Sequence, residues 1–176
     1  KRVRYASVAT IIIAYPRAGV KEIRALSGTG LLVPSTSGRL LKAATFLTTK
    51  WPHLADPNYF LVRLSSGRAD EQKIEKLDDA ALVAQLHNDL VDATGITAEP
   101  VQFYVQRWPA AIPQLEVGHL ELVAKVREEL NHYPGLMLAG SSYDGLGIAA
   151  CMRSGERAAA SCLSLIGNLG FNRSLQ

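Results

Sequence analysis

A glycine-rich stretch near the end of the sequence could bring bare backbone close to a ligand. Residues 136–150 read Leu-Met-Leu-Ala-Gly-Ser-Ser-Tyr-Asp-Gly-Leu-Gly-Ile-Ala-Ala, which suggests a short apolar strand, a loop and the start of a helix. The first N–H groups of a helix have no partner within it and lie at the positive end of its dipole, which suits a phosphate, a carboxylate or an electron-rich carbonyl. Gly140, Gly145 and Gly147 would let the backbone approach such a group without a Cβ in the way.

Spacing alone leaves two interpretations of these glycines. Gly145-x-Gly147-x-x-Ala150 matches the dinucleotide-binding fingerprint, which also needs a strand directly before it and an acidic residue about 20 positions later. Four residues separate Gly140 from Gly145, and no Asp or Glu follows Glu156, so the match is incomplete. The other interpretation is structural, because glycines at a strand–helix turn are common and allow a helix to pack tightly on a sheet.

A longer pattern surrounds the glycines. From Leu138 to Ala159 the chain has Ala-Gly, an aromatic residue, Gly-x-Gly, a Cys, then Ser-Gly and paired alanines. This pattern resembles the C-terminal flavin-binding segment of the protoporphyrinogen oxidases, a family that includes the coproporphyrinogen III oxidases of Gram-positive bacteria. Further fragments follow the family's order along nearly the whole chain: Tyr5-Ala-Ser-Val-Ala, Tyr15-Pro-Arg, Gly30-Leu-Leu-Val-Pro, Lys50-Trp-Pro-His, Gly67-Arg, Arg107-Trp-Pro, Ile112-Pro-Gln and Val117-Gly-His.

The resemblance implies the C-terminal part of an FAD-dependent porphyrinogen oxidase in haem biosynthesis. Such an enzyme converts coproporphyrinogen III to coproporphyrin III, or protoporphyrinogen IX to protoporphyrin IX, with oxygen as the acceptor. FAD is then the expected cofactor, and the porphyrinogen and oxygen are the expected partners. The alternatives are a flavin amine oxidase-like enzyme and a non-catalytic fragment or interaction module. Activity is expected only together with an N-terminal dinucleotide-binding half, without which this chain should bind FAD weakly or not at all.

The resemblance also assigns roles to particular residues. Backbone N–H groups near Gly147, Ile148 and Ala149 would face the N1/C2=O edge of the flavin, where negative charge develops on reduction. Between Gly147 and Cys151 the chain has Ile-Ala-Ala, where relatives often have Pro or Asn and sometimes Asp, so only a backbone role carries over. Gly140 would approach the phosphate or ribityl side. The predicted cofactor-binding residues are Trp108, Gly140, Gly145, Gly147, Ile148 and Ala149, with Trp108 either a wall near the cofactor or core packing.

Other polar residues are weaker candidates for chemistry. A porphyrinogen carries propionates, so a substrate site should present Arg or Lys, and Arg39, Lys42, Lys50 and Arg107 are candidates that are equally explained as surface charges. His119 stands at a helix start, as a structural cap, a bonded core group or a base. The sequence therefore assigns no catalytic and no substrate-binding residue.

Composition indicates an ordinary globular chain. The 176 residues are 48% hydrophobic and 20% charged, with a net charge of +3. Lys and Arg are scattered among Asp and Glu without a basic run, so we expect no nucleic-acid partner. Cys151 and Cys162 fall on one predicted helix, too far apart to bridge, and the histidines show no zinc spacing. No apolar run reaches the length of a membrane span. We expect a cytoplasmic protein, with peripheral contact at the inner face of the membrane and a homodimer left open.

Two elements have the clearest local signals. Tyr5–Tyr15 is almost entirely apolar or β-branched, which predicts a central strand buried on both faces. Asp78 or Asp79 can cap a helix that Gly95 ends. Strands are expected at 30–33 and 40–47, which form a hairpin, and at 59–64, 101–108 and 136–139. Helices are expected at 79–93, 119–133 and 147–169. The buried stripe of the last helix is predicted to contain Ile148, Cys151, Met152, Gly155, Ala159, Cys162 and Ile166.

This order of elements predicts an α+β fold with a mostly antiparallel mixed sheet and helices. By resemblance, the C-terminal strand–loop–helix completes an FAD-binding domain. Residues 1–110 would form a substrate-domain sheet region with a helix at 79–94. Residues 111–176 would form a helix and the C-terminal FAD-binding segment, and the N-terminal dinucleotide-binding half would have no counterpart in the chain.

Overall fold

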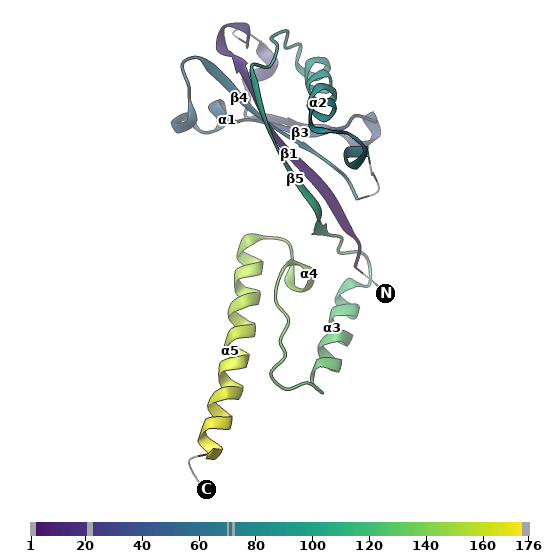
Figure 1. Cartoon of the computed structure of the whole chain (residues 1–176), viewed down its shortest axis with the longest axis vertical. Coiled ribbons are helices and arrows are strands. Elements are labelled where there is room, and N and C mark those ends of the chain that lie inside the picture. Colours follow the sequence, from purple (N-terminus) through teal and green to yellow (C-terminus); the bar gives the residue numbers. More distant parts are fainter. Residues whose placement is uncertain (1–2, 21–22, 70, 72, 174–176) are drawn as a thin grey trace. The chain divides into compact units, whose positions relative to one another are not determined.

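The computed structural model describes residues 3–20, 23–69, 71 and 73–173, except for the side chains of 168–173. The chain divides into two compact units (Figure 1). The first unit is Ala6–Ala111, and the second combines Lys1–Tyr5 with Ile112–Gln176.

A five-stranded sheet in the order β2-β3-β4-β1-β5 forms the frame of the first unit. β1 (Tyr5–Pro16) pairs antiparallel with β4 (Tyr59–Ser66), and β4 pairs antiparallel with β3 (Leu41–Phe46). β3 forms the predicted hairpin with β2 (Gly30–Leu32), and β5 (Gln102–Pro113) lies at the edge beside β1. The predicted α+β class with an antiparallel sheet is therefore confirmed.

Helix α2 (Asp79–Thr94) lies against the sheet and completes the core (Figure 1). The Asp78 side chain accepts a hydrogen bond from the Ala81 N–H at 2.8 Å, and Gly95 ends the helix at φ 73°, so both predicted caps are confirmed. Three leucines one turn apart on α2 join a buried cluster with alternate residues of the central strands. The cluster includes Leu82, Leu86, Leu90, Ile11, Ile13, Tyr15, Val62 and Leu64.

β1 is buried on one face only, so the predicted burial of both faces is wrong. Ile11 and Ile13 are fully buried, whereas Ile12 between them is 36% exposed. Side chains of a strand alternate between the two faces, and α2 packs on only one of them. The apolar run predicted the strand correctly, but it could not show whether other segments cover its second face.

β5 continues to Pro113 rather than ending at Trp108 as predicted. Pro109 and Pro113 do not interrupt it, because on an edge strand the missing proline N–H can face away from the ladder. The connections contain short helical turns. These are α1 (Leu47–Lys50) and the 3-10 turns Arg17–Val20, Arg24–Leu26, Ser35–Ser37, Pro52–Leu54 and Lys73–Lys76.

The second unit contains α3 (His119–Leu130), α4 (Ser141–Asp144) and α5 (Ile148–Arg173). α3 ends before the predicted Tyr133, and α4 is a single turn that the sequence did not indicate. α5 starts one residue after the predicted Gly147. In the described part of the chain, none of the helices has the length and apolar character needed to cross a membrane.

The predicted strand at Leu136–Ala139 is wrong. A strand exists only where its backbone groups form a ladder with a neighbour, and no described strand of this chain pairs with this segment. The apolar pattern was a local signal, whereas the ladder partner would have to come from elsewhere in the sequence.

The predicted buried stripe of α5 is also wrong. Ile148, Met152 and Ile166 are 83%, 62% and 64% exposed, whereas Ser154 is 1% exposed. Cys151 and Cys162 are partly buried and unbridged. Apolar residues lie on more than one side of α5, and the buried side is the one on which Ser154 finds hydrogen-bond partners.

We expect Leu86→Ala to lower the free energy of unfolding by about 2–5 kcal/mol, because it leaves a cavity where a fully buried side chain packs between α2 and the sheet. The exposed neighbour Gln85, changed to Ala, is the matched control and should alter stability by less than about 0.5 kcal/mol. Urea unfolding followed by circular dichroism measures both. Equal effects of the two substitutions would contradict the described core.

Candidate functional site

Two glycines bracket the one-turn helix α4 in the loop before α5. Gly140 precedes α4 with φ 115° and ψ −179°, and Gly145 follows it with φ 111° and ψ 160°. Only glycine adopts this combination of angles without strain. The loop therefore needs glycine at both positions for its own conformation.

Gly147 and the first turn of α5 present backbone groups at the surface. The first hydrogen bond of the helix joins the Cys151 N–H to the Gly147 carbonyl at 2.9 Å. The N–H groups of Ile148 and Ala149 precede that bond, so they have no acceptor within the helix. A Cβ added at Gly147 would meet no atom within 4 Å. Free donors at the positive end of a long helix, next to open space, can bind an electron-rich group.

One carboxylate holds this loop to both long helices of the unit. Asp144 Oδ1 accepts a hydrogen bond from Arg127 of α3 at 2.8 Å and forms an ion pair with Arg157 of α5 at 2.9 Å. Asp144 Oδ2 accepts the hydroxyl proton of Ser154, whose Oγ accepts the Gly140 N–H at 3.0 Å. Both ends of α4 are thereby tied to α5.

These donors hold the pKa of Asp144 below its usual range. The hydrogen bond from Ser154 is the largest cause and that from Arg127 the next, while desolvation opposes them. Coulombic attraction to Arg127 and Arg157 adds to the lowering. Asp144 is therefore ionised at neutral pH, and its protein partners account for its position. Its role within this chain is therefore to hold the turn.

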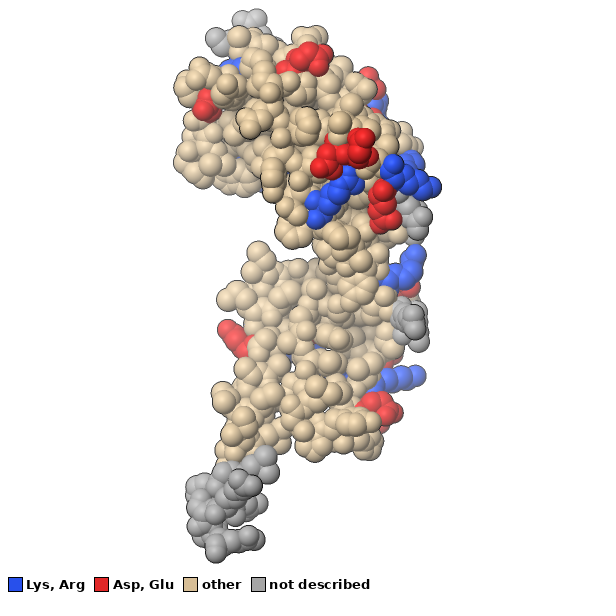
Figure 2. All heavy atoms as spheres, in the orientation of Figure 1, with Lys and Arg blue, Asp and Glu red and all other residues tan. Residues whose placement is uncertain are grey.

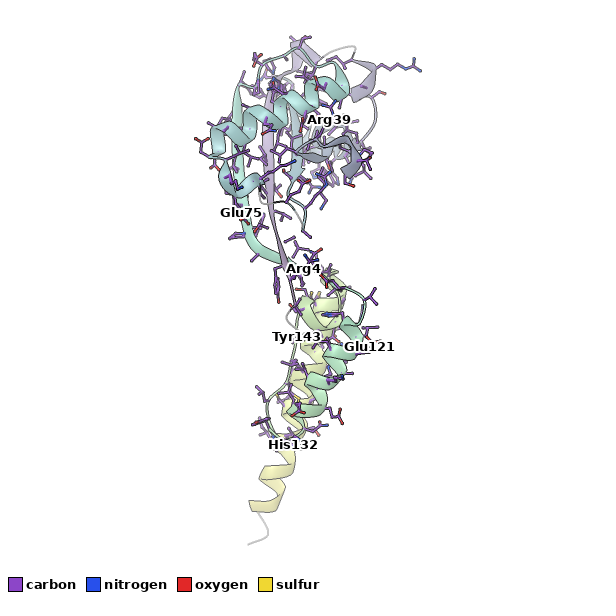
Figure 3. The ribbon with its side chains drawn as sticks, turned by 90° about the vertical axis from the view of Figure 1, so that its right-hand side faces the viewer. Arg4, Arg39, Glu75, Glu121, His132 and Tyr143 are labelled. Carbon is purple, nitrogen blue, oxygen red and sulfur yellow. The ribbon has the colours of Figure 1, made fainter. Side chains whose placement is uncertain are left out.

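A groove of about 790 Å³ lies beside this carboxylate, within the second unit. The segment Tyr133–Leu138 forms one wall, and Leu130 of α3 and Leu165 of α5 line it as well. In Figure 1 this segment runs between α3 and α5. Tyr143, labelled in Figure 3, belongs to α4 and lines a separate hollow of about 310 Å³.

The structure brings most of the predicted cofactor residues together on one loop and helix start. These are Gly140, Gly145, Gly147, Ile148 and Ala149. Trp108 lies on β5 in the first unit, where its side chain is 49% exposed. That exposure argues against full core packing, and the cofactor role of all six residues stays a prediction.

Two arginines proposed from the sequence for propionate binding already have protein partners. Arg39 donates to Asp92 at 2.7 Å and lies 3.8 Å from Asp89, both on α2 (Figure 3). Arg107 donates to Asp79 at 2.8 Å and to two backbone carbonyls before α2. Their guanidinium groups are best explained as fastening α2 to the sheet.

The remaining polar candidates show no arrangement that would bind a ligand. The Lys50 ammonium stands 4.8 Å from the centre of the Trp51 ring, and Lys42 is exposed on β3. His119 is buried, with no partner for its Nε2. On the face drawn in Figure 2, acidic and basic side chains lie close together rather than in a patch of one sign.

Sequence reasoning missed two features. Ser154 and Arg157 stand three residues apart on α5, and a polar residue inside a stretch of small residues was the only local signal of their role. Arg63 interrupts the apolar strand β4, where its Nη2 donates to Thr45 Oγ1 at 3.3 Å and its Nε is buried without a partner. A lone cation between apolar residues was the available signal.

No protein-family model matches the chain. It is 31% identical over 167 residues to the coproporphyrinogen III oxidase of Bacillus subtilis, a match that covers 94% of this chain and 35% of that protein. It is 37% identical over 157 residues to the coproporphyrinogen III oxidase of Mycobacterium leprae, covering 89% of this chain and 33% of that protein. A solved structure from Exiguobacterium sp., provisionally named a protoporphyrinogen oxidase, superposes with a TM-score of 0.77 at 29% identity, covering 94% of this chain and 35% of that one.

The fold and these similarities place the chain among relatives that are named as oxidases. More narrowly, the chain is a homologue of the coproporphyrinogen III oxidases and protoporphyrinogen oxidases over most of its length. The resemblance seen in the sequence is thereby confirmed. The chain spans about a third of the length of these relatives and corresponds to their C-terminal part.

The two kinds of glycine should respond differently to alanine. Gly145→Ala is expected to lower the free energy of unfolding by about 1–3 kcal/mol, because alanine is strained at φ 111°. Gly147→Ala should change it by less than about 0.5 kcal/mol, because no atom lies within 4 Å of the added Cβ. Urea unfolding of both variants gives the comparison, and equal losses would contradict the described loop.

Asp144→Asn should lower the free energy of unfolding at pH 7 by about 1.5–3 kcal/mol, because hydrogen bonds to a charged group are lost. The folded-state pKa lies below the unfolded value of about 4, so the stabilisation is present above pH 4 and disappears as pH falls through the folded-state pKa. The difference between the variant and the unsubstituted chain should therefore shrink on acidification below pH 4.

The control for this measurement is Asp92→Asn. The Asp92 side chain pairs with Arg39 but is 62% exposed, so its removal should cost less than about 1 kcal/mol. A difference for Asp144→Asn that stayed constant from pH 7 to pH 3 would show that the charge of Asp144 contributes nothing.

Proposed function

We propose that this chain is the C-terminal part of an FAD-dependent porphyrinogen oxidase of haem biosynthesis. Its substrate would be coproporphyrinogen III or protoporphyrinogen IX, and oxygen would be the electron acceptor. The observation that carries the proposal is the similarity to coproporphyrinogen III oxidases along 94% of the chain. Of the two substrates we favour coproporphyrinogen III, because the two most similar relatives described above are named for it.

The glycine loop fits the expected flavin. The N–H groups of Ile148 and Ala149 are free of helical partners, and open space stands where a side chain at Gly147 would be. When bound, FAD would supply the redox chemistry by accepting hydride from the porphyrinogen. The chain would contribute the donors at the start of α5, which favour negative charge on the ring edge they face.

The residues around these donors would keep them in place. Asp144 holds α4 through Arg127, Arg157 and Ser154. The backbone angles that only glycine adopts at Gly145 set the course of the loop between α4 and α5. Donors that are fixed before the reaction need no reorganisation when charge develops, which is the main source of electrostatic catalysis. Gly145 would thus act through the backbone conformation, and Gly147 through the space it leaves.

The test uses the complete polypeptide that carries this chain. We expect the purified protein to show visible flavin absorbance and, in air, to oxidise coproporphyrinogen III with a rise in porphyrin fluorescence. Gly147→Val should lower the affinity for FAD at least about tenfold, because its side chain enters the space above the free N–H groups. Gly167→Val is the matched control, because Gly167 lies within α5 and an added Cβ there also meets no atom within 4 Å.

Three results would contradict the proposal. These are a purified protein without flavin that FAD does not restore, oxidation of neither porphyrinogen by the flavin-loaded protein, and equal FAD affinity for Gly147→Val and Gly167→Val. The first two would reject the oxidase assignment, and the third would reject the role of the α5 start.

A further inference from the structure

Arg63 lies in the middle of the sheet on the face that α2 does not cover. Its strand neighbours Val62 and Leu64 belong to the buried core, so by alternation Arg63 points to the opposite, second face. In the register of the sheet it stands between Thr45 of β3 and Ile12 of β1. The position is central, because β4 has a paired strand on each side.

The guanidinium of Arg63 is only partly satisfied. Among the described residues it makes one hydrogen bond, from Nη2 to Thr45 Oγ1 at 3.3 Å, and its buried Nε has no partner there. Within the part of the chain that the structure describes, no carboxylate pairs with it. An arginine keeps its charge at all physiological pH values, and its fork of N–H donors matches a carboxylate in a bidentate arrangement. The Arg63 guanidinium therefore retains N–H donors that can bind an anion.

Small side chains beside Arg63 leave room above the sheet. The neighbouring row of the second face consists of Ala43, Ser65 and Thr10, which are in register across β3, β4 and β1. None of the three is long enough to fold over the guanidinium. A ligand group can therefore reach Arg63 along this row.

Apolar and aromatic side chains border the same face. On β5, Val105 packs against the core and Arg107 binds carbonyls on the α2 side, so Tyr104, Gln106 and Trp108 alternate onto the second face. Tyr104 and Trp108 are 62% and 49% exposed. Exposed rings on the same face as the Arg63 guanidinium suit a ligand that is broad and apolar and carries acidic groups at its rim.

We propose that Arg63 binds a propionate of the porphyrinogen on this second face of the sheet. The inference rests on the proposed oxidase function and names the residue that would fix one edge of the substrate. Arg39 and Arg107 are unsuited because protein carboxylates already hold them. Trp108 and Ile12 would contact the macrocycle while Arg63 and Thr45 bind its acidic rim.

The experiment compares Arg63→Gln, Arg63→Lys and Arg24→Gln in the complete, flavin-loaded polypeptide. Arg24 is an exposed arginine outside the second face and controls for the loss of one positive charge. We expect Arg63→Gln to raise KM for coproporphyrinogen III about tenfold with little change in kcat, because a charge-assisted bond to a remote substrate group is lost. Arg63→Lys should recover part of the loss, and Arg24→Gln should match the unsubstituted protein.

A second substrate separates a carboxylate site from a general effect on the fold. Protoporphyrinogen IX carries vinyl groups in place of some propionates, so Arg63→Gln should raise its KM less than that of coproporphyrinogen III. Flavin absorbance and circular dichroism should be unchanged in the variant. A normal KM for both substrates, with or without a lower thermal stability, would overturn the inference and assign Arg63 to a contact within the protein.

Failure of this inference can be told from failure of the proposed function. If the unsubstituted protein oxidises neither porphyrinogen, the oxidase proposal fails, and equilibrium binding of coproporphyrin III, followed by its fluorescence, decides on Arg63. A dissociation constant about tenfold higher in Arg63→Gln than in Arg24→Gln would support the carboxylate site. Equal constants, or no binding by the unsubstituted protein, would overturn it.

Discussion

The geometry of the second unit depends on the ionised carboxylate of Asp144. Its two oxygens bind donors from α3 and α5, and through Ser154 they reach the backbone at Gly140. The Asp144 carboxylate is partly buried, with 13% of its side chain exposed, and a shielded charge is stable only when donors satisfy it. The loop and the two helices are therefore constrained to the one arrangement in which all these partners meet. The exposed start of α5 has its position because of this polar contact rather than because of apolar packing.

Elements with purely local signals could be predicted from the sequence. The cap at Asp78, the glycine at Gly95 and the leucine spacing of α2 all act within a few residues, and the hairpin of β2 and β3 is equally local. The strand predicted at Leu136–Ala139 was wrong because a strand depends on a paired neighbour, which a local sequence pattern does not contain. The prediction of the buried side of α5 was wrong because a hydrogen bond from Ser154 to Asp144, ten residues earlier, determines which side of the helix is buried.

The candidate site was predictable in its backbone and not in its side chains. Glycine positions mark where the chain turns, and the structure separates Gly140 and Gly145, which the loop conformation requires, from Gly147, which it does not. Arg63 was missed because alternation in β4 says that two faces exist without saying which one is covered. The four basic residues were chosen from the sequence by position alone and without a ranking, and two of them fasten α2.

The edge strands of the sheet determine whether it can pair with a strand of another molecule. One edge strand is β2, which has only three residues. The other is β5, which contains Pro109 and has a positive φ of 44° at Ala110. A short edge strand, or one that contains proline, offers few aligned N–H and C=O groups to a strand from another molecule. The sheet is therefore protected against edge-to-edge polymerisation, even though its second face is open.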